Sequence, residues 1–390
     1  MTQKPNNNRL LSLDILRGIT IAGMIMVNNP GSWNYVYEPL RHAAWNGLTP
    51  TDLVFPFFMF IMGISTFISL RKFNFEFSKP TLFKIIKRTI IIFLIGLGLG
   101  WLSLSFRTFG NLSGEELGFF ERFFKAITDF EHIRILGVMQ RLAITYGATA
   151  LIAILVKHKY IPYIIVVTLF GYFLLLLFGN GFEFSEDNII SVLDRAILGT
   201  NHMYKDSGLA IDPEGLLSTI PAICHVLIGF CCGELLLSTK DNHERIQRLF
   251  IIGAIMTFLG FLLSYGCPIN KKIWSPTFVI ATCGLAATLL ALLIWIIDIK
   301  GYKKWSVFFE SFGVNPLFIY VAAGVFSVLL ANIQFTYYGN LISIKDFAYQ
   351  KCIHPLFGNY LGSLVYALLF VGFNWVIGNI LYKKKIYIKI

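Results

Sequence analysis

A histidine and an aspartate that stand ten residues apart are the first candidates for chemistry in this sequence of 390 residues. His42 lies between two apolar stretches, and Asp52 stands at the start of the second. Histidine changes its charge near neutral pH, so a nearby carboxylate can orient its ring for proton transfer. A simpler interpretation has Asp52 at the positive end of a helix, with His42 and Trp45 at a membrane surface. Spacing alone leaves both interpretations open.

Charged side chains also occur inside apolar stretches, where each costs at least about 2.5 kcal/mol at the centre of a bilayer. Asp14 and Arg17 stand three residues apart and can pair on one face of a helix. Arg141 follows Gln140 and has no acidic neighbour in its own stretch. Its guanidinium fork suits an anionic ligand such as phosphate. For Asp14 and Arg17, a local salt bridge is the structural alternative.

Two polar segments open later apolar stretches. Asp212 and Glu214 flank a proline, which is an ordinary start signal for a helix. Alternatively, the two carboxylates face a cavity and hold an amine or sugar hydroxyls. Asn270 and Trp274 form a short turn that either caps a helix or closes the mouth of such a cavity.

The composition places the chain in a membrane. Hydrophobic residues make up 56% and charged residues 14%, and the mean hydropathy is +0.66. A soluble domain carries about 25% charged residues, so a soluble or disordered protein is excluded. The net charge of +11 falls between apolar stretches, which indicates membrane topology rather than a nucleic-acid partner. We expect an all-α polytopic membrane protein in which residues 1–390 form a single transmembrane domain.

Ten apolar stretches are long enough to cross a hydrocarbon core of about 30 Å. We expect spans at 11–28, 51–70, 88–105, 135–156, 160–178, 215–237, 247–265, 274–297, 306–330 and 361–382. If the N-terminus is cytoplasmic, the inner segments hold 20 Lys and Arg, against 11 in the longer outer segments. This bias predicts that both termini are cytoplasmic. The first stretch carries charged residues, so it is not a cleaved signal.

The cysteines and glycines exclude some other functions. The six cysteines show no metal-site spacing, and we expect no metal. Cys267 and Cys352 both fall on the outer side, so a disulfide between them is an open alternative. The sequence has no Gly-rich phosphate loop of the Walker or Rossmann type, which argues against an ATP-driven pump.

Together these segments resemble one family, the heparan-α-glucosaminide N-acetyltransferases of lysosomes and their bacterial homologues. The resemblance runs in order through nearly the whole chain. Its motifs are Ser12-Leu13-Asp14-Ile15-Leu16-Arg17-Gly18, His42-Ala43-Ala44-Trp45-Asn46-Gly47-Leu48-Thr49, Asp52-Leu53-Val54-Phe55-Pro56, Gly137-Val138-Met139-Gln140-Arg141-Leu142, Asp194-Arg195 with His202, Asp212-Pro213-Glu214-Gly215, and Asn270-Lys271-Lys272-Ile273-Trp274-Ser275.

The resemblance implies that a homodimer moves an acetyl group from cytosolic acetyl-CoA to the amine of a glucosamine-type sugar across the membrane. His42 matches the family's active-site histidine, as a general base in direct transfer, which we favour, or as an acetyl carrier. The basic inner face suits the CoA nucleotide. The expected site has three parts: catalytic His42, Asp52, Asn28 and Asn46; acetyl-CoA-binding Arg141, Gln140, Arg17 and Asp14; and sugar-binding Trp45, Asp212, Glu214, Asn270, Trp274 and His202.

The lysosomal proteins have a luminal N-terminal domain and an extra span ahead of the helix that carries Asp14. This sequence starts directly at that helix, so we expect a bacterial cytoplasmic (inner) membrane protein with its active site open to the outside. Two other functions fit the same composition. An amino-sugar transporter or permease would have no use for CoA, and an O-acyltransferase of cell-wall sugars would differ only in its acceptor.

Overall fold

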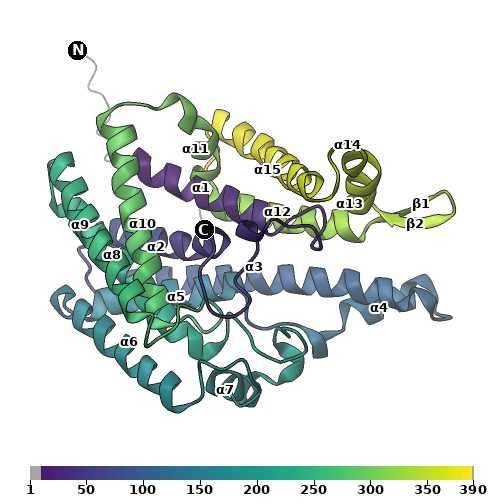
Figure 1. Ribbon diagram of the computed structural model, residues 1–390, viewed down its shortest axis with the longest axis horizontal. Coiled ribbons are helices and arrows are strands. Elements are labelled where there is room, and N and C mark those ends of the chain that lie inside the picture. The colour runs from purple at the N-terminus through teal and green to yellow at the C-terminus, as the bar shows by residue number, and fades with distance from the viewer. Residues whose placement is uncertain (1–9, 389–390) are drawn as a thin grey trace.

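The computed structural model describes residues 10–388 and consists almost entirely of helices (Figure 1), which confirms the expected all-α class. Two short strands, β1 (Gln334–Tyr337) and β2 (Asn340–Ser343), form an antiparallel hairpin. The helices are α1 (Leu11–Val27), α2 (Pro50–Arg71), α3 (Lys79–Asn111), α4 (Phe119–Ile127), α5 (Val138–Leu155), α6 (Ile161–Phe178), α7 (Ile189–Leu198), α8 (Leu216–Ser238), α9 (Asn242–Leu263), α10 (Pro276–Leu293), α11 (Val307–Val314), α12 (Pro316–Asn332), α13 (Ile344–Phe347), α14 (His354–Phe357) and α15 (Asn359–Lys383).

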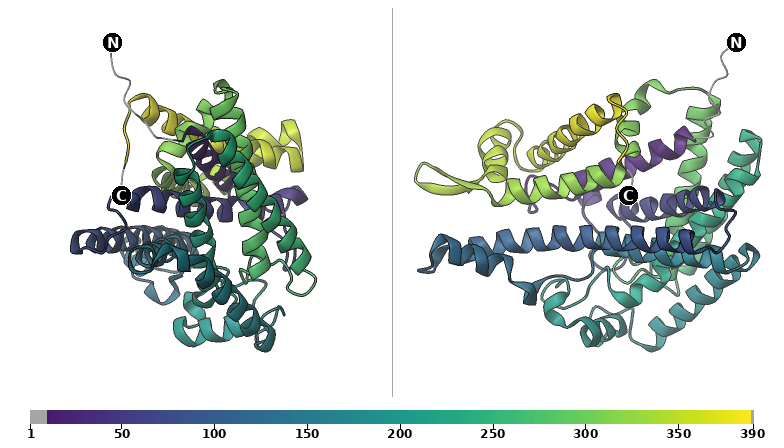
Figure 2. Two further views of the ribbon diagram at one scale, coloured as in Figure 1. Left: turned by 90° about the vertical axis from the view of Figure 1, so that its left-hand side faces the viewer. Right: turned by 180° about the vertical axis from the view of Figure 1, so that it is seen from behind.

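Each of the ten predicted spans coincides with helix. Within the described residues, eight helices are long and apolar enough to cross a membrane: α2, α3, α5, α6, α8, α9, α10 and α15. Helix α1 is shorter, with 17 residues and a length of about 25 Å. The segment α3–α4 and the hairpin after α12 project in the same direction from the bundle (Figure 2).

The prediction of one continuous ninth span is wrong. Helices α11 and α12 meet at a bend of 78°. The bend lies at Pro316, whose ring removes a backbone donor and disfavours helical geometry at the preceding residue. Asn315 accordingly adopts φ −126° and ψ 53°. The predicted outer loops also contain structure, because α4, α7 and the β-hairpin lie within them.

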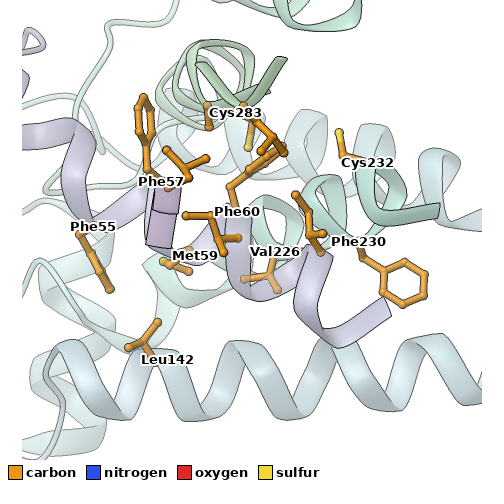
Figure 3. Close-up of a cluster of buried hydrophobic side chains, with 14 of the residues drawn as sticks. Phe55, Phe57, Met59, Phe60, Leu142, Val226, Phe230, Cys232 and Cys283 are labelled. Carbon is orange, nitrogen blue, oxygen red and sulfur yellow. The ribbon is translucent and has the colours of Figure 1, made fainter. Parts of the chain in front are cut away.

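The spanning helices form an inner and an outer group. Helices α2, α5, α8 and α10 bury most of their side chains, whereas α3, α6, α9 and α15 leave most of theirs at the surface. The inner group interlocks through apolar side chains such as Phe60 on α2, Phe230 on α8 and Cys283 on α10 (Figure 3). The outer group exposes large apolar residues, including Val167 and Phe258. Such a surface is stable against lipid and unstable against water.

Helices α2 and α8 run parallel and touch along their backbones. The ring of His225 lies 2.9 Å from the carbonyl oxygen of Pro56, and farther along both helices Gly233 lies against Phe67. Between these contacts, a Cβ on Gly63 would lie 2.1 Å from the carbonyl oxygen of Val226. This approach requires glycine, as at other close helix crossings in membranes.

The N-termini of the four inner helices meet at one end of the bundle. The guanidinium of Arg141, at the start of α5, donates to the carbonyl of Gly215 just before α8. Trp274, just before α10, packs against Phe55 near the start of α2. Each N-terminus carries a partial positive charge and unpaired N–H groups, so this end favours anionic groups.

Gly63 provides a test of the close crossing. Gly63→Ala should destabilise the protein by at least about 2 kcal/mol, because the methyl group would push against backbone that cannot rotate away. Gly171→Ala is the matched control, because its methyl would enter open space on α6. Melting temperatures in detergent should fall for the first variant and stay level or rise for the second. Equal melting temperatures for the two variants would contradict the close approach of α2 and α8 at Gly63.

Candidate active site

A cavity of about 410 Å³ opens at the end of the bundle where the helix N-termini meet. Side chains from the end of α1, the loop before α2, the segment before α5, the segment before α8 and the loop before α10 line it. They carry both signs of charge, as a site for polar substrates requires. The lining residues are Asn28, His42, Ala43, Ala44, Asp52, Arg134, Tyr204, Asp206, Pro213, Glu214, Lys271 and Lys272.

His42 and Asp52 lie in contact, which was one of the two interpretations left open by their spacing. The Nδ1 atom of His42 lies 2.7 Å from Oδ1 of Asp52. The Asp52 side chain is 1% exposed, while that of His42 is 44% exposed. A carboxylate at Nδ1 selects the tautomer whose lone pair is on Nε2. Asp52 therefore orients the ring, and Nε2 lies away from the carboxylate, 3.5 Å from Nζ of Lys271.

The second oxygen of the Asp52 carboxylate, Oδ2, is held by three hydrogen bonds. Oδ2 accepts hydrogen bonds from the backbone N–H groups of Ala43 and Thr49 and from the Thr49 hydroxyl, at 3.1, 3.2 and 3.0 Å. Thr49 is the N-cap of α2, and Asp52 is the third residue of the helix, which is the arrangement of a capping box. Asp52 therefore caps the helix and also contacts the ring of His42.

Lys271 adds a cation to this pair. Its Nζ lies 3.0 Å from Nδ1 of His42 and 3.4 Å from Oδ1 of Asp52. The lysine side chain is only 15% exposed. Burial lowers the pKa of Lys271 below its ordinary value, although the Asp52 carboxylate opposes the shift. Lys271 can therefore give up its proton more readily than a surface lysine.

Arg134 forms the opposite wall of the cavity. Its guanidinium donates to both oxygens of Asp212, at 3.0 and 2.6 Å, and to Oε2 of Glu214 at 2.6 Å. Burial alone would lower the pKa of Arg134, but the two carboxylates outweigh this effect and raise it above its ordinary value. The guanidinium also lies over the Tyr204 ring, 5.1 Å from its centroid. Asp212 is fully buried and holds the arginine, while Glu214 reaches the cavity.

Arg141 and Gln140 lie behind the wall of the cavity and do not line it. Arg141 is fully buried, donates to the hydroxyl of Ser218, and lies 4.9 Å from the centroid of the Trp274 ring. Trp274 is itself fully buried. These contacts join the starts of α5, α8 and α10 beneath the cavity.

Several other expected sugar-site residues connect the loops around the cavity. Asn270 is buried, and its side chain donates to Asn46 at 3.1 Å, which joins the loop before α10 to the loop before α2. The Trp45 ring donates to the carbonyl of Phe182 at 2.7 Å. The Nδ1 atom of His202 lies 2.8 Å from the carbonyl oxygen of Ile133, next to Arg134 in the chain. None of these side chains is among those that line the cavity, but all of them position residues that do.

Asp14 and Arg17 lie far from His42. Arg17 donates to Asp14 at 2.8 Å and to the Ser65 hydroxyl at 2.7 Å. Asp14 is 14 residues from Asn28 along α1, or about 21 Å. The structure therefore contains the local salt bridge that was the alternative interpretation. Asn28, at the end of α1, does line the cavity.

Sequence reasoning did not select Arg134, Lys271, Lys272, Tyr204 or Asp206. Lys271 and Lys272 stand inside the Asn270–Ser275 motif, so their positive charge in that motif could have indicated that they belong to the site. Lys272 donates to the carbonyl of Ala44 and to Asp206. Arg134 stands alone before α5, and its carboxylate partners are about 80 residues away in the chain. Cys267 and Cys352 are both free thiols, so the disulfide left open by the sequence is not present.

Two curated relatives match this chain over almost all of its length. The human heparan-alpha-glucosaminide N-acetyltransferase is 27% identical over 441 residues, covering 98% of this chain and 60% of the relative. The mouse protein of the same name is 28% identical over 450 residues, covering 100% of this chain and 62% of the relative. No family model matches the chain.

The chain is similar to the heparan-alpha-glucosaminide N-acetyltransferases along almost its whole length. The resemblance inferred from the motifs is thereby confirmed. The chain spans about 60% of the length of these curated relatives.

A buried carboxylate beneath this site makes stability depend on pH. Asp194 on α7 accepts a hydrogen bond from the N–H of Leu216 at 2.9 Å, and a Cβ on Gly215 would collide with it. Burial raises the pKa of Asp194 from 3.8 to about 6. The folded state therefore holds this proton more tightly than the unfolded state, and ionisation costs stability as the pH rises from 4 through 6.

Asp194→Asn keeps the acceptor oxygen and removes the charge. Relative to the wild type, the variant should become more stable as the pH rises from 4 to 7, by about 3 kcal/mol in unfolding free energy. The measurement is the difference between the two melting temperatures at each pH. Asp129→Asn should show no such gain between pH 4 and pH 7, and it should lose less stability than the wild type when the pH falls below 4. Burial would raise the pKa of Asp129, but the hydrogen bonds with His132 and Thr108 and the nearby positive charges together outweigh burial and lower that pKa. If the melting temperatures of Asp194→Asn and the wild type change with pH in the same way, the raised pKa of Asp194 is contradicted.

Proposed function

We propose that this protein transfers an acetyl group from acetyl-CoA to the amine of a glucosamine-type sugar, with His42 as the general base. The observation that carries the proposal is the 2.7 Å contact between His42 Nδ1 and Asp52 Oδ1 at the edge of a polar cavity. The two relatives, which are named as N-acetyltransferases of a glucosaminide, support the reaction class.

The proposed chemistry begins with a proton transfer. An amine must be neutral to attack a thioester, and His42 can accept its proton at Nε2. Asp52 then stabilises the imidazolium that forms, because it already holds the opposite nitrogen. The same nitrogen can return the proton to the departing thiolate. This is direct transfer, and no acetyl-enzyme intermediate is needed.

Lys271 is placed to stabilise the charge that develops during this step. The carbonyl oxygen of the thioester becomes an oxyanion, and Nζ of Lys271 lies beside the base that starts the reaction. Asn28 supplies an amide at the rim of the same cavity. Fixed donors of this kind stabilise a transition state without reorganising.

The cavities fit the two substrates. A volume of about 410 Å³ is typical of small-molecule sites and admits a sugar ring beside a thioacetyl group. Asp206 and Glu214 can accept hydrogen bonds from sugar hydroxyls or an ammonium group. A second cavity of about 180 Å³ shares Asn28 and continues between α1, α3 and α12. Its lining by Met24, Leu99 and Tyr320 suits the uncharged arm of CoA.

The proposal includes a direction. The excess of Lys and Arg in the short loops at the opposite end of the bundle supports a cytoplasmic location for that end. The His42 cavity then opens to the outside of a bacterial inner membrane. Acetyl-CoA would be drawn from the cytosol, and the sugar from the other side.

The first test supplies purified protein in detergent with radiolabelled acetyl-CoA and glucosamine. Wild type should label the sugar, and His42→Ala should lose about 10²- to 10⁴-fold in rate. His132→Ala is a matched control, because His132 forms a similar 2.7 Å contact with Asp129 outside the cavity. Its rate should be that of the wild type.

Several outcomes would count against the proposal. A folded His42→Ala protein with full activity would remove His42 from the chemistry. Label retained on wild type without sugar would replace direct transfer by an acetyl-histidine route. Label on glucose as well as glucosamine would indicate an O-acyltransferase. Sugar counterflow in vesicles without CoA, with no labelling, would indicate a transporter.

Lys271 can be tested through the pH dependence of the rate. Because the pKa of Lys271 is lowered, the wild-type kcat should fall at a lower alkaline pH than the pH at which an ordinary lysine loses its proton. Lys271→Arg should extend activity to higher pH, since a guanidinium stays protonated. Lys271→Met should lose about 10²-fold in kcat at pH values where the wild-type lysine is protonated, and the difference should shrink as the pH rises past the pKa of Lys271. Lys205→Met, an exposed lysine outside the cavity, is the control. Identical pH profiles for wild type and Lys271→Arg would contradict this role.

A further inference from the structure

A second polar cavity lies at the opposite end of the bundle. Its volume is about 200 Å³, and it is formed by the end of α2, the first half of α3 and one residue of α5. It is separated from Asp52 by most of the length of α2, about 27 Å from Asp52 to Leu70. The lining residues are Ser69, Leu70, Phe73, Thr81, Lys84, Ile85, Lys87, Arg88, Ile91 and Tyr146.

Three cations line this cavity, and no carboxylate does. Lys84, Lys87 and Arg88 share one face of α3, since their spacing is that of one helical turn. Within residues 10–388, none of the three is in an ion pair with Asp or Glu. The charges repel one another, so an anion that enters between them is attracted by all three.

Arg88 is the most informative of the three. Its Nε atom is buried and has no hydrogen-bond partner in the described part of the chain. Its guanidinium is held over the Tyr146 ring, 4.6 Å from the centroid. Lys84 likewise lies 4.9 Å from the centroid of Phe73. The aromatic rings hold the cations in place while leaving their donors free, and a buried donor without a partner is costly unless a ligand satisfies it.

We propose that this cavity binds the phosphate groups of an anionic ligand. Arginine and lysine donors grouped within one helical turn match the several oxygens of a phosphate or diphosphate. The hydroxyls of Ser69 and Thr81 lie on the same lining and supply further polar contacts.

Two sources share this chemistry. One is the nucleotide end of CoA, and this form of the inference rests on the proposed function. The other is the headgroup of an anionic phospholipid, because the cavity lies where charge bias places the cytoplasmic surface of the membrane. The binding site is the same in both cases, and the experiment separates the ligands.

The test replaces Lys84, Lys87 and Arg88 together by Gln. A control variant replaces Arg71, Lys72 and Lys79 by Gln, which removes the same charge at the same end from exposed residues outside the cavity. Both proteins are first checked for an unchanged melting temperature. CoA and 3′-dephospho-CoA are then titrated calorimetrically in zwitterionic detergent, and retained phosphatidylglycerol is counted by native mass spectrometry.

For the nucleotide, the Kd of CoA should rise at least about tenfold in the cavity variant and stay unchanged in the control variant. For the lipid, the Kd of CoA should stay constant while the cavity variant alone loses bound phosphatidylglycerol. Either result supports the site and names its ligand. Wild-type behaviour of the cavity variant in both assays would overturn it.

These binding assays need no turnover. If His42→Ala retains activity, the proposed function fails while the phosphate site stands. If acetyl-CoA transfers its acetyl group to the sugar but neither CoA nor lipid binding responds to the cavity variant, the phosphate site fails alone.

Discussion

The buried carboxylate of Asp52 is the constraint on which the cavity end of the helix bundle depends. An ionised group that is 1% exposed is stable only when its oxygens are fully hydrogen-bonded. The required donors come from His42, Ala43 and Thr49, so the whole loop before α2 must fold over the helix start. The position of the His42 ring is thus a consequence of satisfying one buried charge.

That carboxylate stays where it is because the helices beneath it cannot shift. The glycine crossing of α2 and α8 sets their separation, and Arg141 with Trp274 links the starts of α5, α8 and α10 below the cavity. The convergent N-termini also supply positive potential, which favours the anionic side chains Asp52 and Glu214 at their ends. Packing in the membrane region therefore determines the geometry of the site outside it.

The sequence predicted what depends on local pattern. Apolar length located the long apolar helices, although it missed the bend that divides the expected ninth span. The charge at the start of α2 marked Asp52, because a capping carboxylate is recognisable within four residues. It did not predict partners that are distant in the chain. Lys271 is 229 residues from His42 in the chain, and Arg134 is 78 residues from its partner Asp212.

Arg141 has no acidic neighbour in its own segment, which is why the sequence suggested that it binds a ligand. Its partners, the Gly215 carbonyl and the Trp274 ring, lie on other segments. The bend at Pro316 was visible in the sequence but was outweighed by the continuous apolar pattern around it.

The two polar cavities differ in how their charges are compensated, and this difference bears on what each can do. Around His42, cations and carboxylates alternate, so Lys271 has Asp52 and Arg134 has Glu214. Such a site is stable without a ligand and is ready to move protons. Around Arg88, two of the three cations, Lys84 and Arg88, lie over aromatic rings, and the lining contains no carboxylate. A site of that kind has its charge compensated from outside the chain, which suits a place where an anion is held rather than one where it reacts.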